Sequence, residues 1–206
     1  MRIAIDCATD TLTPIALPDG IEVVAVAVAA SNGRVPIFAG VAEYTTELAI
    51  ASSRRMQKAG AAGLMALPTM VYEQDAREAL SHFSALAAAV DLPIMIYNNR
   101  VSYKVDLQPE HFEQLANCPN IVAVKESSHD SRRMTDMINR LGDRFAMLCG
   151  VDDLALENLL FGAVGWVSGM ANSFPAEAVA LFDEGAVFAL DRVVHRHENH
   201  GSRRAR

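Results

Sequence analysis

Two side chains that can take part in proton transfer stand at the ends of two apolar runs. Lys125 ends the run IVAVK at residues 121–125, and Tyr97 ends the run IMIY at residues 94–97. Both runs are typical of buried strands, and polar residues at the carboxyl ends of parallel strands line the active sites of α/β folds. We therefore predict that Lys125 and Tyr97 are catalytic residues that face one mouth from neighbouring strands.

The residue types of this pair favour nucleophilic catalysis by the lysine. Burial disfavours the ammonium form of a lysine, and a neutral amine can attack a ketone to form an imine, or Schiff base. A phenol such as that of Tyr97 can relay a proton to or from the imine. The alternatives are a Lys125 that reaches solvent or pairs with Glu126 or Asp130, and a core tyrosine whose hydroxyl bonds to the backbone.

Short apolar strands alternate with longer amphipathic helices along most of the chain. The strands are predicted at residues 35–40, 62–68, 92–98, 120–126, 145–150 and 164–169. The helices are predicted at residues 20–30, 45–59, 73–89, 109–116, 131–141 and 152–161, with one more starting at Pro175. This alternation predicts a parallel α/β sheet, either doubly wound or closed into a (β/α)₈ barrel. No glycine-rich phosphate loop follows any of these strands, which disfavours a nucleotide-binding domain.

Composition narrows the class of protein. The 206 residues suggest one domain, and the 51% hydrophobic content is enough for a sizeable core. The net charge of -7 argues against a nucleic-acid partner, and no apolar run has the roughly 18–20 residues that cross a membrane. The three cysteines are scattered and the start of the chain is not typical of a secretory signal, so we predict a cytoplasmic protein. The tail histidines, His195, His197 and His200, lack the closed four-ligand set of a structural zinc site, so we predict no metal.

Several segments resemble one known family. LPIMIYNN, PNIVAVKESSHD and FAMLCGVDDLALENLLFGAVGWVSGMANSFP, at residues 92–99, 119–130 and 145–175, resemble in order motifs of the dihydrodipicolinate synthase and N-acetylneuraminate lyase family. The resemblance runs from about Gly33 to Leu181. It implies a (β/α)₈ barrel of the TIM type, in which Lys125 forms the Schiff base with a 2-oxo acid and Tyr97 relays the proton. It also implies a homo-oligomer, commonly a tetramer, and the lysine imine makes a cofactor unnecessary.

The ends of the chain depart from the family pattern, so we predict an incomplete barrel. About six βα units are recognisable, and the first one or two are missing or rewritten. The family's Thr-Thr turn, which binds the substrate carboxylate, has no counterpart before the strand at 35–40. We therefore divide the chain into a divergent segment at 1–30, barrel units at 31–182, and a divergent segment with a polar, basic tail at 183–206.

The loop after Tyr97 narrows the expected substrate, a small 2-oxo acid or cyclic imino acid. Ser102 in YNNRVSYK takes the place of an arginine that holds a carboxylate in the synthases, and we do not expect Arg100 to replace it. The pattern is closest to the deaminase branch, whose member in hydroxyproline catabolism acts on 1-pyrroline-4-hydroxy-2-carboxylate. The alternatives are an aldol lyase of the dihydrodipicolinate synthase type and an inactive, truncated remnant.

Four further residues are predicted to contact the substrate. These are Ser127, Tyr103, Gly169 and Asn172. Ser127 and its neighbour Ser128 fit equally well as caps of the next helix. We interpret Asp152 as a helix N-cap, and both Arg132 and Arg133 as a solvated helix face.

Overall fold

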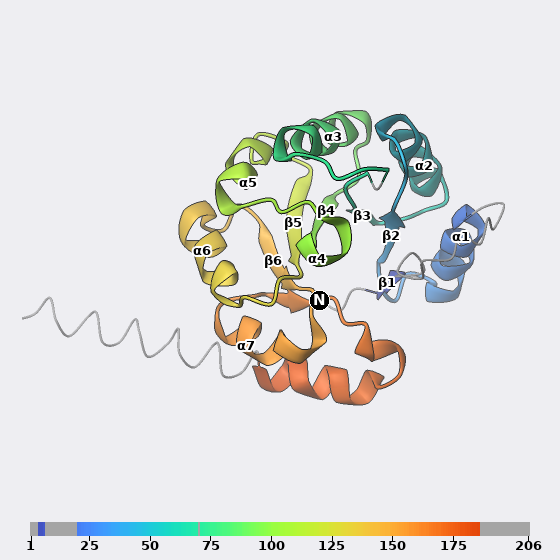
Figure 1. The fold of residues 1–206 in the computed structure, drawn as a ribbon. Helices are drawn as coiled ribbons and strands as arrows, with labels where there is room; N and C mark the ends of the chain where they lie inside the picture. The colour runs from blue at the N-terminus through green and yellow to red at the C-terminus, as the bar shows by residue number, and fades with distance from the viewer. Residues whose placement is uncertain (1–3, 7–19, 70, 186–206) are drawn as a thin grey trace, which may run out of the picture. The chain divides into compact units, whose positions relative to one another are not determined.

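The computed structural model of this protein describes residues 4–6, 20–69 and 71–185, which fall in two compact units (Figure 1). The first unit ends at Val124 and the second begins at Lys125, inside strand β5 (Ile121–Glu126). Tyr97 therefore belongs to the first unit, and Lys125 is the first residue of the second.

Parallel strands alternate with helices through the first unit. Besides the start of β5, its described elements are β1 (Ala4–Asp6), α1 (Gly20–Ser31), β2 (Ile37–Val41), α2 (Thr46–Lys58), β3 (Gly63–Ala66), α3 (Ala76–Ala89), β4 (Ile94–Asn98), α4 (Arg100–Tyr103) and α5 (Pro109–Leu115). Strands β1 to β4 pair in chain order, and each pairing is parallel. Leu64 of β3, for example, lies opposite Ala39 on one side and Ile94 on the other.

The strands of this unit are buried, as their continuous apolar sequences predict. Every residue of β3 and β4 is buried, and so is every residue of β2 except Phe38. Helix α3 packs against both α2 and α5. Apolar strands covered by helices leave polar side chains only at the strand ends, where they are available for a site.

The helix starts follow the capping chemistry of the sequence. Leu48 N–H donates to Thr45 Oγ1 at 3.2 Å, which confirms Thr45 as the cap of α2. Helix α3 begins three residues later than predicted, because Asp75 and Glu78 form a capping box. Glu78 N–H donates to Asp75 Oδ1 at 2.8 Å, and Asp75 N–H donates to Glu78 Oε2 at 3.0 Å.

The second unit continues the alternation. After the end of β5 its described elements are α6 (Arg132–Leu141), β6 (Ala146–Cys149), the 3₁₀ turn η1 (Asp152–Leu154), α7 (Ala155–Leu160), β7 (Gly165–Trp166), the 3₁₀ turn η2 (Met170–Asn172) and a helix over residues 175–185. Strands β6 and β7 are parallel, with Cys149 opposite Trp166. Helix α7 packs against both of these strands. The strand predicted at 164–169 is therefore present but only two residues long.

The sequence pattern does not predict strand β1 or helix α4. Strand β1 has only three residues, which is too short to show a periodicity. Helix α4 is a single turn inside a predicted loop, and Asn99 caps it. The tail with His195, His197 and His200 lies outside the described residues, so the predictions made for it stay predictions. Among the described helices, none combines the length and the apolarity needed to cross a membrane.

Candidate functional site

Lys125 is a buried lysine near the end of a buried strand. It is the fifth of the six residues of β5, and its side chain is 3% exposed. The apolar residues before it, Ile121, Ala123 and Val124, are buried as well. The sequence prediction of a lysine buried at the carboxyl end of a strand is therefore confirmed. The alternative, in which Lys125 reaches solvent, is excluded by its burial.

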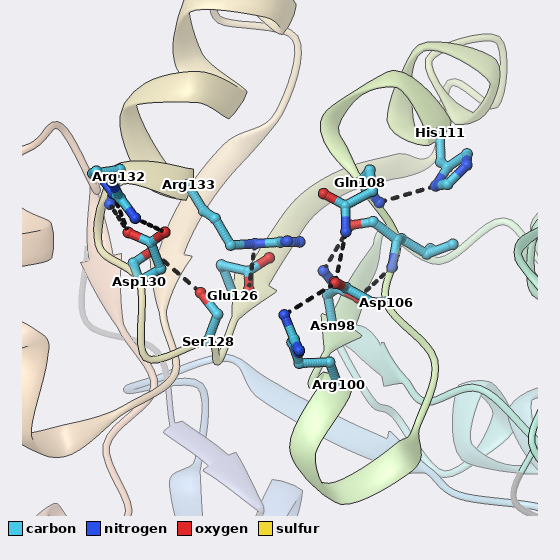
Figure 2. A network of polar contacts seen from close by, with 11 residues as sticks. Asn98, Arg100, Asp106, Gln108, His111, Glu126, Ser128, Asp130, Arg132 and Arg133 are labelled. Carbon is cyan, nitrogen blue, oxygen red and sulfur yellow. Dashed lines mark hydrogen bonds and ion pairs between the residues drawn. The ribbon is translucent and has the colours of Figure 1, made fainter.

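Both carboxylates that the other alternative assigned to Lys125 bond to arginines (Figure 2). Arg133 Nε lies 3.3 Å from Glu126 Oε1, and both side chains are buried. Arg132 instead forms a two-pronged pair with Asp130, through Nε to Oδ1 at 2.8 Å and Nη2 to Oδ2 at 2.7 Å. These hydrogen bonds lower the pKa of Asp130 to about 2.

The interpretation of Arg132 and Arg133 as a solvated helix face is therefore wrong for one of the two. The Arg132 side chain is 83% exposed, as predicted, but that of Arg133 is only 11% exposed. Position on α6 explains the difference, because neighbouring residues of a helix point in directions about 100° apart. Arg133 points toward Glu126 at the end of β5, and thereby ties α6 to the strand that carries Lys125.

Ser127 and Gly150 lie against each other beside Lys125. Ser127 is 3% exposed, and its Oγ has no hydrogen-bond partner among the described residues. A Cβ placed on Gly150 would overlap Ser127 Oγ and would lie 2.9 Å from both Cγ and Cε of Lys125. Gly150 N–H donates to the Glu126 carbonyl at 2.9 Å, which holds this close approach in place. A side chain at position 150 would therefore force the side chains of Ser127 and Lys125 to move.

Ser128, the next residue, is bonded within its own loop. Its Oγ donates to the Asp130 carbonyl at 3.3 Å. The helix-capping alternative for Ser127 and Ser128 finds no support, because the residue before α6 is Ser131 and no side-chain cap bond forms there. Of the two neighbouring serines, Ser127 is the one whose hydroxyl remains available beside the lysine.

Tyr97 is held by the loop that follows it in the first unit. It is 5% exposed, and its hydroxyl accepts a hydrogen bond from Asn99 Nδ2 at 3.1 Å. Asn99 Oδ1 in turn accepts from Ser102 N–H at 3.0 Å, so one side chain both caps α4 and orients the phenol. The ring of Tyr103 packs edge-on against that of Tyr97, with centroids 5.3 Å apart. Two residues predicted separately for the site, Tyr97 and Tyr103, are thus in contact.

Sequence reasoning missed Asn99, although one signal was present. An asparagine two residues after a strand-end tyrosine shares its side in an extended chain, and asparagine is a preferred helix cap. The capped turn of α4 holds Asn99 against the phenol. Because an amide N–H donates to the phenol oxygen, the proton of Tyr97 points away from Asn99.

Asn98 closes the same loop at its base (Figure 2). Its Nδ2 donates to the Leu107 carbonyl at 3.0 Å, and its Oδ1 accepts from Leu107 N–H at 3.1 Å. Within the loop, Arg100 lies 3.7 Å from Asp106, which also accepts from Gln108 Nε2 at 2.6 Å. Arg100 is thus paired with a carboxylate of its own loop, in agreement with the expectation that it does not replace the family's arginine.

Gly169 and Asn172 belong to a separate polar cluster in the second unit. Asp152 accepts hydrogen bonds from Ser168 Oγ, Gly169 N–H and Met170 N–H, at 3.0–3.1 Å. The prediction of Asp152 as a helix N-cap is therefore wrong, because it lies inside η1 and its carboxylate instead accepts from the backbone at the start of η2, whose N-cap is Gly169. Asn172 N–H donates to the Gly169 carbonyl at 3.3 Å. Both backbone groups of Gly169 are thus bonded within the protein.

Two buried groups near the strand ends carry shifted pKa values. Burial lowers the pKa of His82, whose Nε2 lies 3.1 Å from the Leu67 carbonyl and whose Nδ1 lies 2.9 Å from Thr46 Oγ1. A carbonyl only accepts, so the neutral ring carries its proton on Nε2. Burial also raises the pKa of the Cys149 thiol, directly before Gly150, and keeps it protonated.

The described residues include a surface hollow that shares no residue with the predicted site, and no cluster suited to a metal ion. A surface hollow of about 560 Å³ between α3 and α5 is lined by Arg77, Ser81 and His111 among others, and by none of the predicted site residues. The described part of the chain holds no group of three or more His, Cys, Asp or Glu side chains that could bind a metal ion. The residues predicted to be catalytic, Tyr97 and Lys125, lie near the ends of β4 and β5.

Comparisons with known proteins identify a family and several proteins to which this chain is similar. The model of the dihydrodipicolinate synthetase family matches residues 6–198. A 4-hydroxy-tetrahydrodipicolinate synthase of Sorangium cellulosum is 38% identical over 156 residues, which are 75% of this chain and 52% of the relative. The crystal structure of dihydrodipicolinate synthase from Aquifex aeolicus superposes with a TM-score of 0.78 at 29% identity, over 87% of this chain and 61% of that one.

A second similar solved structure is described as a complex with a ligand. It is the chloride-inhibited dihydrodipicolinate synthase from Acinetobacter baumannii complexed with pyruvate, with a TM-score of 0.74 at 29% identity, over 86% of this chain and 64% of that one. These likenesses confirm the predicted fold class, an incomplete (β/α)₈ barrel of the TIM type. The chain spans about half the length of the curated relative that it matches.

Proposed function

This chain belongs to the dihydrodipicolinate synthetase family, and we propose that it is a lyase that forms a Schiff base between Lys125 and a small 2-oxo acid. The observation that carries the proposal is the placement of Lys125. Its side chain is 3% exposed, near the end of β5. A buried lysine at the carboxyl end of a strand stands where α/β barrels carry their catalytic side chains, and an amine there can act as a nucleophile.

The proposed first step joins the lysine to the substrate. The neutral Nζ of Lys125 donates its electron pair to the carbonyl carbon, and the carbonyl oxygen leaves as water with the two amine hydrogens. The resulting C=N bond, once protonated, draws electrons from the neighbouring carbon, so that a proton or a carbon group can leave that carbon. No bound metal or organic cofactor is needed for this step, because the protonated imine itself accepts the electrons.

Tyr97 is the proposed proton relay. Its phenol is oriented by Asn99, which donates to the phenol oxygen. With that contact made, the phenol can present its own proton to a second acceptor. Tyr103, Ser127, Gly169 and Asn172 remain proposed substrate contacts. Among the four, Ser127 has the strongest support, because its buried hydroxyl has no partner among the described residues.

The reaction type is best proposed as an aldol-type synthase or lyase. The first relative reported above is named a 4-hydroxy-tetrahydrodipicolinate synthase, and the Acinetobacter baumannii relative was crystallised with pyruvate. These names favour the aldol alternative over deamination of 1-pyrroline-4-hydroxy-2-carboxylate. One observation keeps the deaminase as a second candidate. The exposed Ser102 replaces the carboxylate-binding arginine, and Arg100 pairs with Asp106.

Reductive trapping tests the proposal directly. The full chain is incubated with pyruvate and sodium borohydride, and the adduct is located by peptide mass spectrometry. The sequence holds three lysines, Lys58, Lys104 and Lys125, so the assignment is unambiguous. We expect the adduct on Lys125. A cooperatively folded chain, judged by circular dichroism, that yields no adduct with any 2-oxo or imino acid would support the inactive alternative instead.

The assembly and location of the protein are also proposals. Small-molecule substrates and homo-oligomers are typical of the family, so we propose a cytoplasmic homo-oligomer. Size-exclusion chromatography with light scattering would measure the mass of the assembly. A purely monomeric chain that still forms the Lys125 adduct would show that the chemistry does not depend on association.

A further inference from the structure

Glu126, the residue after Lys125, is bonded to two other elements of the second unit. Its side chain meets Arg133 of α6, with Arg133 Nε and Glu126 Oε1 3.3 Å apart and the two side chains 11% and 5% exposed (Figure 2). Its backbone carbonyl accepts from Gly150 N–H at 2.9 Å, directly after β6. The end of β5 is therefore fixed both to α6 and to the end of β6.

The same contacts define the place of Lys125. Neighbouring residues of a strand point to opposite faces, so the side chains of Lys125 and Glu126 lie back to back. On its own face, Lys125 packs against Gly150, where an added Cβ would lie 2.9 Å from both Cγ and Cε of the lysine. Because Glu126 holds Gly150 through its carbonyl and shares a peptide bond with Lys125, a movement of Glu126 also moves the lysine.

The buried pair is suited to fixing geometry rather than to adding stability. Removing two charges from water costs free energy that their attraction only partly repays, and replacing a buried pair by apolar side chains of similar volume is often neutral or stabilising. An arginine and a carboxylate adopt a directional arrangement, whereas apolar contacts are non-directional. The neighbouring pair of Arg132 and Asp130 is largely exposed to solvent, and provides the contrast.

We propose that Arg133 is a positioning residue, which through Glu126 fixes the direction from which the Lys125 amine reaches the carbonyl carbon of the substrate. This inference rests on the proposed Schiff base at Lys125. In this role Arg133 acts only through Glu126 and exchanges no proton with the substrate. Nucleophilic attack is sensitive to such placement, because an error of about 1 Å can slow a reaction about 100-fold.

The test follows imine formation over time. The full chain is mixed with saturating pyruvate and quenched with sodium borohydride at successive times, and the reduced adduct is measured by intact-protein mass spectrometry. We expect Arg133→Met to slow imine formation at least about tenfold, and Arg133→Lys, which keeps the charge, to recover part of the rate. Arg132→Met, the matched control, should form the imine at the wild-type rate.

A double variant separates positioning from stability and from charge. Arg133→Met combined with Glu126→Met replaces the buried pair by apolar side chains of similar volume and removes both charges. We expect urea titration to give a stability close to that of the wild type, while imine formation stays slow. A purely structural pair would instead return the rate together with the stability.

The outcomes separate the inference from the function on which it rests. No imine with any 2-oxo acid in the wild type overturns the proposed function, and this inference with it. A wild-type rate in folded Arg133→Met, or in the stable double variant, overturns the inference alone. If the double variant does not fold, the single variants decide. Equal rates in Arg133→Met and Arg133→Lys, with both folded by circular dichroism, also overturn the inference.

Discussion

The polar side chains that follow β4 and β5 differ in whether they form hydrogen bonds within the protein. After β4, both polar atoms of Asn98 bond to the Leu107 backbone, and both polar atoms of Asn99 bond to Tyr97 and Ser102. After β5, the hydroxyl of Ser127 is buried without a partner among the described residues. The first loop is built to orient a side chain, and the second retains hydrogen-bonding capacity that a ligand can use.

The largest effect is expected at the β5 end. Lys125→Met removes the nucleophile while keeping the shape of the side chain, so the borohydride adduct should disappear entirely. Lys58→Met changes an exposed lysine of α2 and should leave the adduct intact. Intact-protein mass spectrometry after trapping measures both. An adduct that persists in Lys125→Met would move the chemistry away from this strand end.

Substitutions near the end of β4 should affect the proton transfer that follows imine formation. Tyr97→Phe removes the proposed proton relay, so deuterium exchange at the methyl group of pyruvate in D₂O should slow by about 100-fold, while the Lys125 adduct still forms. Asn99→Ala leaves the phenol but removes the amide that orients it, and we expect a smaller slowing. Proton NMR follows the exchange. Loss of the adduct in Tyr97→Phe would show that the β4 loop acts on imine formation instead.

The next largest effect is expected on stability, at the buried ion pair between Arg133 and Glu126. Arg133→Met takes the guanidinium from a carboxylate that is 5% exposed, and should lower the free energy of unfolding by about 3 kcal/mol. Arg132→Met breaks the exposed pair with Asp130 and should cost much less. Urea titrations of the two variants make the comparison. Equal losses would mean that α6 is not held to β5 through Arg133.

Removing one polar side chain at each strand end sharpens the contrast. Asn98→Ala removes two buried hydrogen bonds to the backbone of Leu107 and should cost about 2 kcal/mol. Ser127→Ala removes a hydroxyl that has no partner among the described residues, so we expect no loss of stability or a small gain. Thermal melts of both variants without ligand test this. A marked loss in Ser127→Ala would show that its hydroxyl is bonded in the free protein.

The smallest effect is expected at the end of β3, on the pH dependence of stability. His82 bonds the Leu67 carbonyl just after β3, and burial lowers its pKa below the ordinary histidine value of 6.5. The unfolded chain then binds this proton at higher pH than the folded one does. The stabilisation is complete above about pH 6.5 and is lost as the pH falls toward the lowered pKa. His82→Gln should flatten this part of the stability–pH curve, measured by urea titration between pH 5 and about 8. An unchanged slope would assign the effect to another group.

Local sequence signals predicted the elements well, and long-range contacts account for what they missed. Thr45 at a helix start and Pro109 at a first helical position mark α2 and α5, and the apolar run before Lys125 marks β5. The inward position of Arg133 depends on Glu126, which belongs to another element. The sequence alone therefore gives no sign that Arg132 and Arg133 differ in burial. The need for glycine at position 150 likewise arises only once β6 delivers it against Lys125 and Ser127.

The aromatic residues give each unit its own optical signal. The single tryptophan, Trp166, lies in β7 opposite Cys149 in the second unit, while all four tyrosines lie between residues 44 and 103 in the first. Tryptophan emission therefore reports on the unit that carries Lys125, and tyrosine absorbance reports on the unit that carries Tyr97. Recording both during one denaturant titration reveals whether the nucleophile and its proposed proton relay lose their structure in a single cooperative event.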